Sequence, residues 1–117
     1  MTVVLVDARN VLRSRWPNIP EPELVERACR WASREGVRAL LVFDGPAPEG
    51  GADGVCEPIG TGRESADDWI VRAAGEYAAA GTPYWLVTSD RAVRAAAGGH
   101  AERVIGGGAF AGTMLES

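Results

Sequence analysis

The sequence predicts an α/β domain with a central parallel sheet of four to five strands and helices on both faces. Short apolar runs rich in β-branched residues are typical of strands buried inside a parallel sheet. Longer segments with apolar residues at helical spacing separate these runs, and glycine or proline stands at most junctions. The 117 residues suffice for one core, so we expect a single domain over residues 1–117.

The first half of the chain is predicted to alternate strand, helix and strand. Residues 2–6 are an uninterrupted apolar and β-branched run, which predicts a buried strand. Residues 21–34 are predicted to form a helix, because their apolar side chains recur at helical spacing. Pro22 suits the first turn of that helix, and Gly36 is expected to end it. Residues 39–43 form a second apolar run and predict the next strand.

The second half continues the alternation after a loop at residues 45–54, which is rich in glycine and proline. The expected elements are a strand at residues 55–59, a helix from a cap at Ser65 to about Ala80, a strand at residues 84–88, a helix at residues 91–97 and a strand at residues 103–105. From Gly106 the pattern is ambiguous, and we expect a loop with one helical turn.

The charged residues narrow the classes of function. All twelve basic residues are arginine, against sixteen acidic residues, so the formal net charge is −4. This balance argues against a protein that coats DNA through bulk positive charge, but it is compatible with a nucleic-acid enzyme whose site is acidic. The sequence contains no lysine, which excludes the phosphate-binding loop of nucleotide hydrolases and any Schiff-base lysine.

The two cysteines, Cys29 and Cys56, stand far apart without a Cys-x-x-Cys spacing. This pattern argues against a zinc site and against a disulfide framework, and we expect both thiols to be reduced. No apolar run approaches ~18 residues, and no secretory signal opens the sequence. We therefore expect a cytoplasmic protein that does not act at a membrane.

Acidic residues follow three of the predicted strands, at Asp7, Asp44 and Asp90. Because right-handed crossovers place the carboxyl ends of parallel strands at one edge of the sheet, we expect these carboxylates to converge there. Glu64 and Asp67, at the start of the long helix, are expected at the same edge. Clustered carboxylates repel one another, and Mg²⁺ or Mn²⁺ would relieve that repulsion. Alternatively, each strand-end aspartate only caps the helix that follows it.

Polar and cationic residues near these acids are candidate substrate-binding groups. Arginines cluster near the predicted acidic edge, among them Arg9 and Arg13, and guanidinium groups bind phosphate bidentately. We expect the substrate-binding role at Asn10, Arg63, Ser89 and Arg91. For Asn10 the alternative is a simple turn residue, and for Ser89 it is a helix cap. Trp16 can stack an unpaired base.

Four short segments, at residues 6–11, 42–45, 64–70 and 87–91, together resemble motifs of NYN domains, which belong to the PIN-like nuclease superfamily. Residues 6–11 (Val-Asp-Ala-Arg-Asn-Val) resemble the V-D-G-x-N-V opening of these domains, and residues 42–45 resemble their V-F-D-G segment. Residues 64–70 resemble the E-x-A-D-x-x-I helix of the YacP-like branch, and residues 87–91 resemble the V-T-S-D-R segment of that branch. The four motifs occur in the family order, so the chain is similar to YacP-like proteins.

This resemblance implies a PIN-like three-layer fold and a divalent-metal-dependent endoribonuclease acting on single-stranded RNA. In the YacP-like branch it implies cleavage of ribosome-associated mRNA, and pairing in the superfamily leaves a homodimer open. The family's metal positions match Asp7, Asp67 and Asp90, with Glu64 as a ligand or orienting group, and its supporting positions match Asp44 and Asn10. Ala8 stands where the family usually has glycine, so the path of that loop is expected to differ.

Two other classes of function stay open at the level of sequence. A non-catalytic module that binds RNA or protein can keep the same fold, and it predicts that Asp7→Asn leaves RNA affinity unchanged. A phosphatase that forms an aspartyl phosphate needs Asp-x-Asp at the first strand, and Arg9 occupies the second of those positions. The resemblance favours the nuclease over both.

Overall fold

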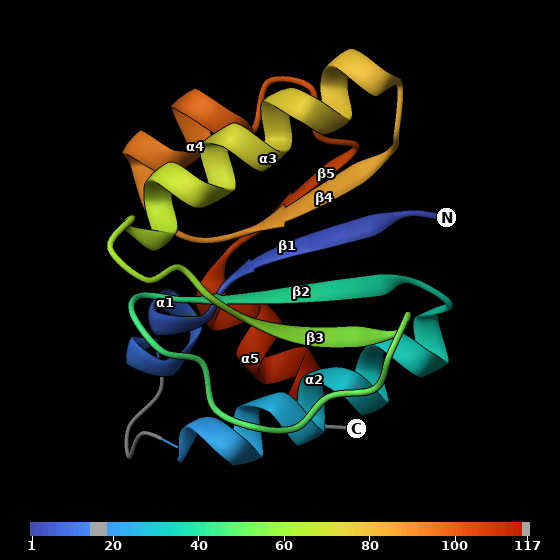
Figure 1. Ribbon diagram of the computed structural model, residues 1–117. Helices are drawn as coiled ribbons and strands as arrows, with labels where there is room; N and C mark the ends of the chain where they lie inside the picture. The colour runs from blue at the N-terminus through green and yellow to red at the C-terminus, as the bar shows by residue number, and fades with distance from the viewer. Residues whose placement is uncertain (15–18, 116–117) are drawn as a thin grey trace.

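Five parallel strands form the central sheet of the molecule (Figure 1). The computed structural model describes residues 1–14 and 19–115 of the chain. The strands are β1 (Val3–Asp7), β2 (Arg38–Phe43), β3 (Cys56–Gly60), β4 (Tyr84–Val87) and β5 (Arg103–Ile105), in the spatial order β3-β2-β1-β4-β5. Every neighbouring pair is parallel, as the sequence predicts.

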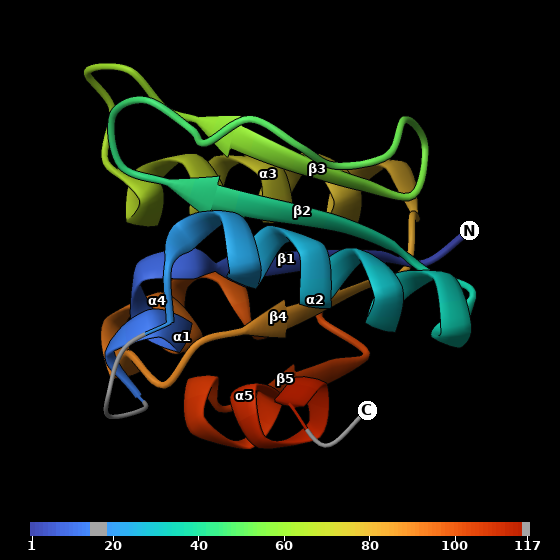
Figure 2. The same ribbon diagram turned by 90° about the horizontal axis from the view of Figure 1, so that it is seen from below.

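Helices cover both faces of this sheet. The helices on one face are α1 (Ala8–Arg13), α2 (Glu21–Glu35) and α5 (Gly107–Leu115), and those on the other are α3 (Ala66–Ala80) and α4 (Arg91–Ala97) (Figure 1, Figure 2). This three-layer arrangement confirms the predicted fold class. Within the described residues, no helix combines the length and the apolar character that a membrane crossing requires.

Alternate side chains of the central strand β1 enter two separate cores. Val4 belongs to the core under α2 and α5, where the rings of Trp31 and Phe110 meet edge to face with their centroids 4.9 Å apart. Leu5 belongs to the core on the other face, together with Ile70 of α3. Because both faces of β1 are covered, its sequence is a continuous apolar run rather than an alternating one.

The ends of the two long helices follow the sequence prediction closely. Ser65 caps α3, and its Oγ accepts a hydrogen bond from the backbone N–H of Asp68 at 3.1 Å. Gly36 follows α2 with φ of 68°, and Gly81 follows α3 with φ of 72°. Both glycines therefore adopt the left-handed conformation that ends a helix at little steric cost.

Two helices differ from what the sequence predicts. α1 lies between the first predicted strand and the first predicted helix, where the sequence predicts no regular element. Its six residues are too few to show a helical period. α5 has nine residues where one turn is expected. Its glycines lower its intrinsic helix propensity, and burial of Phe110 and Met114 in the core shared with α2 compensates for that loss.

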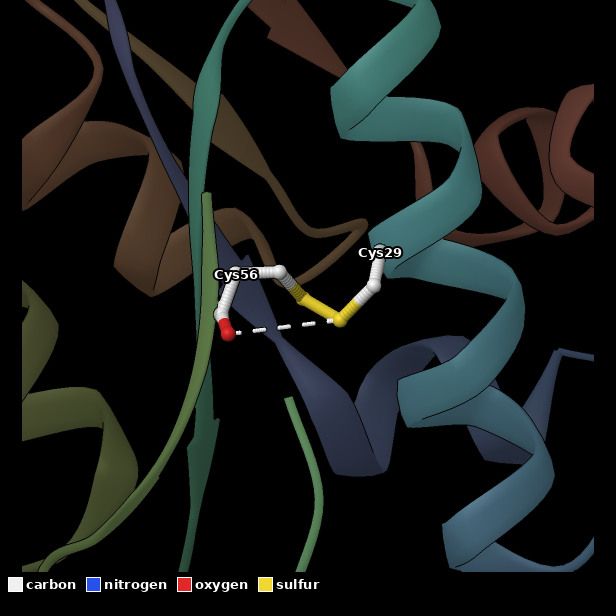
Figure 3. The surroundings of a disulfide bond; sticks show 2 residues. All are labelled: Cys29 and Cys56. Atoms are coloured by element: carbon white, nitrogen blue, oxygen red, sulfur yellow. Dashed lines mark hydrogen bonds between the residues drawn. A yellow bond between two sulfur atoms is a disulfide. The ribbon is translucent and has the colours of Figure 1, made fainter. Parts of the chain in front are cut away.

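A disulfide bond joins Cys29 of α2 to Cys56, the first residue of β3 (Figure 3). Their Cα atoms are 5.1 Å apart, which is within the usual range for a disulfide. The expectation of two reduced thiols is therefore wrong for this structure. The sequence separation of 27 conceals the contact, which arises because α2 packs across the sheet onto the edge strand β3.

Candidate functional site

The strand order reverses at β1, which makes the carboxyl ends of the strands around it the expected ligand-binding edge. The chain builds β2 and β3 on one side of β1, and after α3 it crosses to build β4 and β5 on the other. A cavity of about 250 Å³ lies at this edge. Its lining residues are Asp7, Arg9, Asn10, Arg13, Asp44, Ser65, Asp67 and Asp90. We call it the acidic cavity, because four separate segments contribute its aspartates.

Asp7 is the last residue of β1 and is only 5% exposed. Its Oδ2 accepts a hydrogen bond from Thr88 Oγ1 at 3.0 Å, and its Oδ1 accepts one from the backbone N–H of Asn10 at 3.4 Å. Burial raises the pKa of the Asp7 carboxyl, and the negative charges of Asp67 and Asp44 add to the rise, while the two hydrogen bonds oppose it. The negatively charged form of Asp7 is therefore less favourable here than that of an aspartate in water.

Thr88 connects Asp7 to the next carboxylate of the cavity, Asp90. The Thr88 hydroxyl is fully buried, donates to Asp7 and accepts a hydrogen bond from the backbone N–H of Asp90 at 3.1 Å. Asp90 caps α4, and its Oδ1 accepts from the backbone N–H groups of Ala92 and Val93 at 2.9 and 3.1 Å. The sequence pattern does not predict this role of Thr88, although the residue lies inside the V-T-S-D-R segment.

Asp44 and Asp67 approach the cavity from the end of β2 and the start of α3. Asp44 Oδ1 accepts a hydrogen bond from the backbone N–H of Ala66 at 2.8 Å, so it fixes the first turn of α3. Asp67 lies in that turn with an exposed side chain. Its pKa is raised by partial burial, then by the negative charges of Asp90, Asp44 and Asp68.

Four of the residues expected at the site lie outside the lining of the acidic cavity, namely Arg63, Glu64, Ser89 and Arg91. Glu64 pairs with Arg72 of α3, with Oε2 at 2.5 Å from Nη2 and Oε1 at 3.3 Å from Nε. This partner also raises the pKa of Arg72. Arg63 and Arg91 are exposed and do not line the cavity. Trp16 lies outside the described residues.

Asn10 and Ser89 form a hydrogen-bonded link between α1, the β4–α4 loop and α5. Asn10 Oδ1 accepts from the backbone N–H of Ser89 at 2.9 Å, and Ser89 Oγ accepts from the backbone N–H of Gly107 at 2.9 Å. A methyl group at Gly107 would overlap Asn10 Oδ1, so a larger residue here would force that oxygen away from its hydrogen bond with Ser89. The link holds the residue before Asp90, and nothing in the sequence pattern pointed to Gly107.

The donor atoms of the acidic cavity suit a hard divalent cation. Its four carboxylates offer oxygen ligands, which Mg²⁺ and Mn²⁺ prefer. Across residues 1–14 and 19–115, however, no three His, Cys, Asp or Glu side chains form a group ready to hold a metal ion. A cation bound here would therefore have to draw the carboxylates closer together, and the exposed Asp67 side chain has the most freedom to move.

A larger cavity of about 480 Å³ lies between α2 and residues 49–55. Its walls are mainly apolar and include Val25, Val55 and the disulfide-bonded Cys29. It lies on the α2 face of the sheet, away from the carboxyl ends of the strands. The smaller acidic cavity is the better candidate for chemistry, because charged groups from four segments converge there.

The fold is shared with proteins of known structure. No family model and no curated protein matches the chain. The crystal structure of a tryptophan-to-leucine mutant of Rae1 (YacP) from Bacillus subtilis matches 99% of this chain and 76% of that one, with a TM-score of 0.77 at 22% identity. A second crystal structure of Rae1 covers 99% and 75%, with a TM-score of 0.74 at 22% identity. The chain therefore has a YacP-like fold.

Proposed function

We propose that this protein belongs to the YacP-like branch of the NYN domains and is a divalent-metal-dependent endoribonuclease that cleaves single-stranded RNA. One observation carries the proposal, namely that four aspartates from four segments line one cavity at the strand-order reversal of a YacP-like fold. This convergence disfavours the charged forms of Asp7 and Asp67. The pKa of both carboxyls is raised by burial and further raised by the neighbouring carboxylates. Clusters of carboxylates with perturbed pKa values are typical of catalytic sites.

Asp7, Asp67 and Asp90 would hold the cation. The hydrogen bonds that position Asp7 and Asp90 leave lone pairs on both carboxylates, since each oxygen can accept more than one contact. A Mg²⁺ or Mn²⁺ ion held there would supply an activated water and would neutralise charge that develops on a phosphodiester. Its charge would also offset the repulsion that contributes to the raised pKa of Asp7 and Asp67.

The remaining residues of the site hold these carboxylates in place. Asp44 anchors the first turn of α3, which carries Asp67. The ion pair between Glu64 and Arg72 supports the orienting role for Glu64 rather than the ligand role. Asn10 and Ser89 fix the loop that leads into Asp90. The binding of phosphate by Arg63 and Arg91 stays a prediction.

The proposed reaction is a hydrolysis in one displacement. A water oxygen forms the new bond to phosphorus, and the bond from phosphorus to the 3′ oxygen breaks in line with it. The products then carry a 5′-phosphate and a 3′-hydroxyl, and the enzyme forms no covalent intermediate. The resemblance to YacP-like proteins supports mRNA on the ribosome in the cytoplasm as the substrate, and a homodimer stays a prediction.

The test is cleavage of an end-labelled single-stranded RNA by the purified protein with Mn²⁺, with Mg²⁺ and with EDTA. We expect cutting with either cation, none with EDTA and a loss of at least about a hundredfold in Asp7→Asn. Asp53→Asn is the matched control, because Asp53 is exposed in the loop before β3 and does not line the acidic cavity. Products that end in a 2′,3′-cyclic phosphate would refute the mechanism.

The same preparation distinguishes the nuclease from a binding module. Without cutting, and with calorimetry showing no Mn²⁺ binding, the fold would be a non-catalytic module, and Asp7→Asn would keep the affinity for RNA. If Mn²⁺ binds but free RNA is not cut, the assay is repeated on mRNA engaged by ribosomes, which is the substrate that the resemblance implies.

A further inference from the structure

Two arginines of α1 form one wall of the acidic cavity. Arg9 and Arg13 both line it, and their spacing of four residues places them on the same side of the helix. Arg63 and Arg91, which the sequence pattern favours for phosphate binding, do not line it. The positive charge nearest to the four aspartates therefore comes from the face of the sheet opposite α3 and α4.

The side chains of these two arginines are available to a ligand. Arg13 is exposed and forms no ion pair with any described residue, whereas most arginines of α2 and α3 pair with a glutamate of their own neighbourhood. Arg9 is 54% exposed, and its Nε lies 3.7 Å from Asp44 Oδ2. An exposed ion pair of this length contributes little stability, so Arg9 can turn to another anion at small cost.

We propose that Arg9 and Arg13 bind the phosphate backbone of the RNA, which therefore crosses the site along α1. This inference rests on the proposed function, because it assigns the substrate contacts of the same site. An RNA backbone is repelled by four carboxylates, and a cationic wall beside them offsets that repulsion during binding. Guanidinium groups suit this task because they hold phosphate oxygens bidentately.

A structural role for Arg13 makes a different prediction. Arg13 lies in the last turn of α1, where a positive charge interacts favourably with the helix dipole. Loss of that interaction would lower stability slightly and would leave the salt dependence of RNA binding unchanged. Release of counterions from the RNA is the readout that only a phosphate contact alters.

The experiment measures the affinity of Arg13→Gln for a fluorescein-labelled single-stranded RNA by anisotropy, in EDTA and over a range of salt concentrations. We expect Kd to rise roughly tenfold. The slope of log Kd against log salt is expected to fall by about 0.7, the value for one phosphate contact on a single strand. Arg13→Lys keeps the charge and is expected to retain the slope while losing part of the affinity.

Arg34→Gln is the matched control. Arg34 is likewise exposed in the last turn of a helix and forms no ion pair with a described residue, but α2 ends near the amino edge of the sheet. The proposal is overturned if Arg13→Gln leaves Kd and the salt slope unchanged, or if Arg34→Gln alters them equally. It is also overturned if Arg91→Gln or Arg63→Gln weakens binding more than the double change Arg9→Gln/Arg13→Gln.

Failure of this inference is distinguishable from failure of the proposed nuclease. A wild-type protein that cuts RNA with Mn²⁺ while Arg13→Gln shows unaltered affinity and KM refutes only the role of the arginines. A wild-type protein that never cuts, but whose RNA affinity falls in Arg13→Gln with the expected change of slope, refutes only the nuclease. In the Mn²⁺ assay the proposal predicts that KM of Arg13→Gln rises by a larger factor than kcat falls.

Discussion

The disulfide between Cys29 and Cys56 gives the most quantitative prediction for the stability of the fold. Reduction reopens a loop with a sequence separation of 27. The loop-entropy relation assigns a bridge of this span about 3.5 kcal/mol of the free energy of unfolding at 25 °C. For a chain of 117 residues this corresponds to a fall in Tm of roughly 14 °C. Reductant is therefore expected to lower the thermal midpoint by about that amount.

The assay is thermal unfolding followed by circular dichroism, with and without a phosphine reductant, after alkylation has shown that the starting protein has no free thiol. The matched control is Cys29→Ala/Cys56→Ala, whose midpoint should be low in both conditions. RNA cleavage at 25 °C should survive reduction, because neither cysteine lines the acidic cavity. A wild-type midpoint that moves by less than about 2 °C would refute the assignment of this stability to the bridge.

Two further predictions concern the acidic cavity and its supports. Gly107→Ala places a methyl group against Asn10 Oδ1. We therefore expect urea unfolding to show a fall of about 1–3 kcal/mol in the free energy of unfolding, and RNA cleavage to slow. Gly108→Ala is the control, because its methyl group meets only an ordinary contact and should change neither quantity. The raised pKa of Asp67 means that its charged form is disfavoured in the folded state, so stability is lost as pH rises from the unfolded value of 3.8 through the folded pKa. Asp67→Asn should therefore raise the free energy of unfolding at pH 7 but not at pH 3, and added Mn²⁺ should stabilise the wild type and not the variant.

The regular elements of the fold are accessible from the sequence because each is decided locally. The strands β1 and β2 are mostly apolar runs that lie between two helical layers, and the long helices end at glycines whose φ values only glycine adopts readily. α1 and α5 are less accessible. The first begins at the hydrogen bond that Asp7 accepts from Asn10, and the second depends on Phe110 packing against Trp31. Both depend on contacts that a local pattern does not contain.

The sequence predicts which residues meet at the site, but not which hydrogen bonds and ion pairs their side chains form. Convergence of the strand-end aspartates follows from the handedness of parallel crossovers, and the acidic cavity bears out that convergence for Asp7, Asp44 and Asp90. Side-chain partners do not follow from it. The sequence predicts Thr88 as an ordinary strand residue. In the structure its hydroxyl is hydrogen-bonded both to the Asp7 carboxylate and to the backbone N–H of Asp90. Glu64 belongs to the acidic stretch at residues 64–68, yet its side chain pairs with Arg72, one helical turn beyond that stretch.

The two interpretations of the strand-end aspartates, helix cap and catalytic carboxylate, are not exclusive here. Asp7 and Asp90 do cap the helices that follow them, and Asp44 accepts a hydrogen bond at the start of α3. Capping fixes the direction of each carboxylate and brings three helix N-termini to the edge where negative charge gathers. Asp67 is different, because it caps nothing and its side chain is largely exposed, yet partial burial and then three other aspartates raise its pKa. The dipole of α3 favours an acid in its first turn, and under the proposed function a divalent cation would offset the repulsion between Asp67 and the other aspartates.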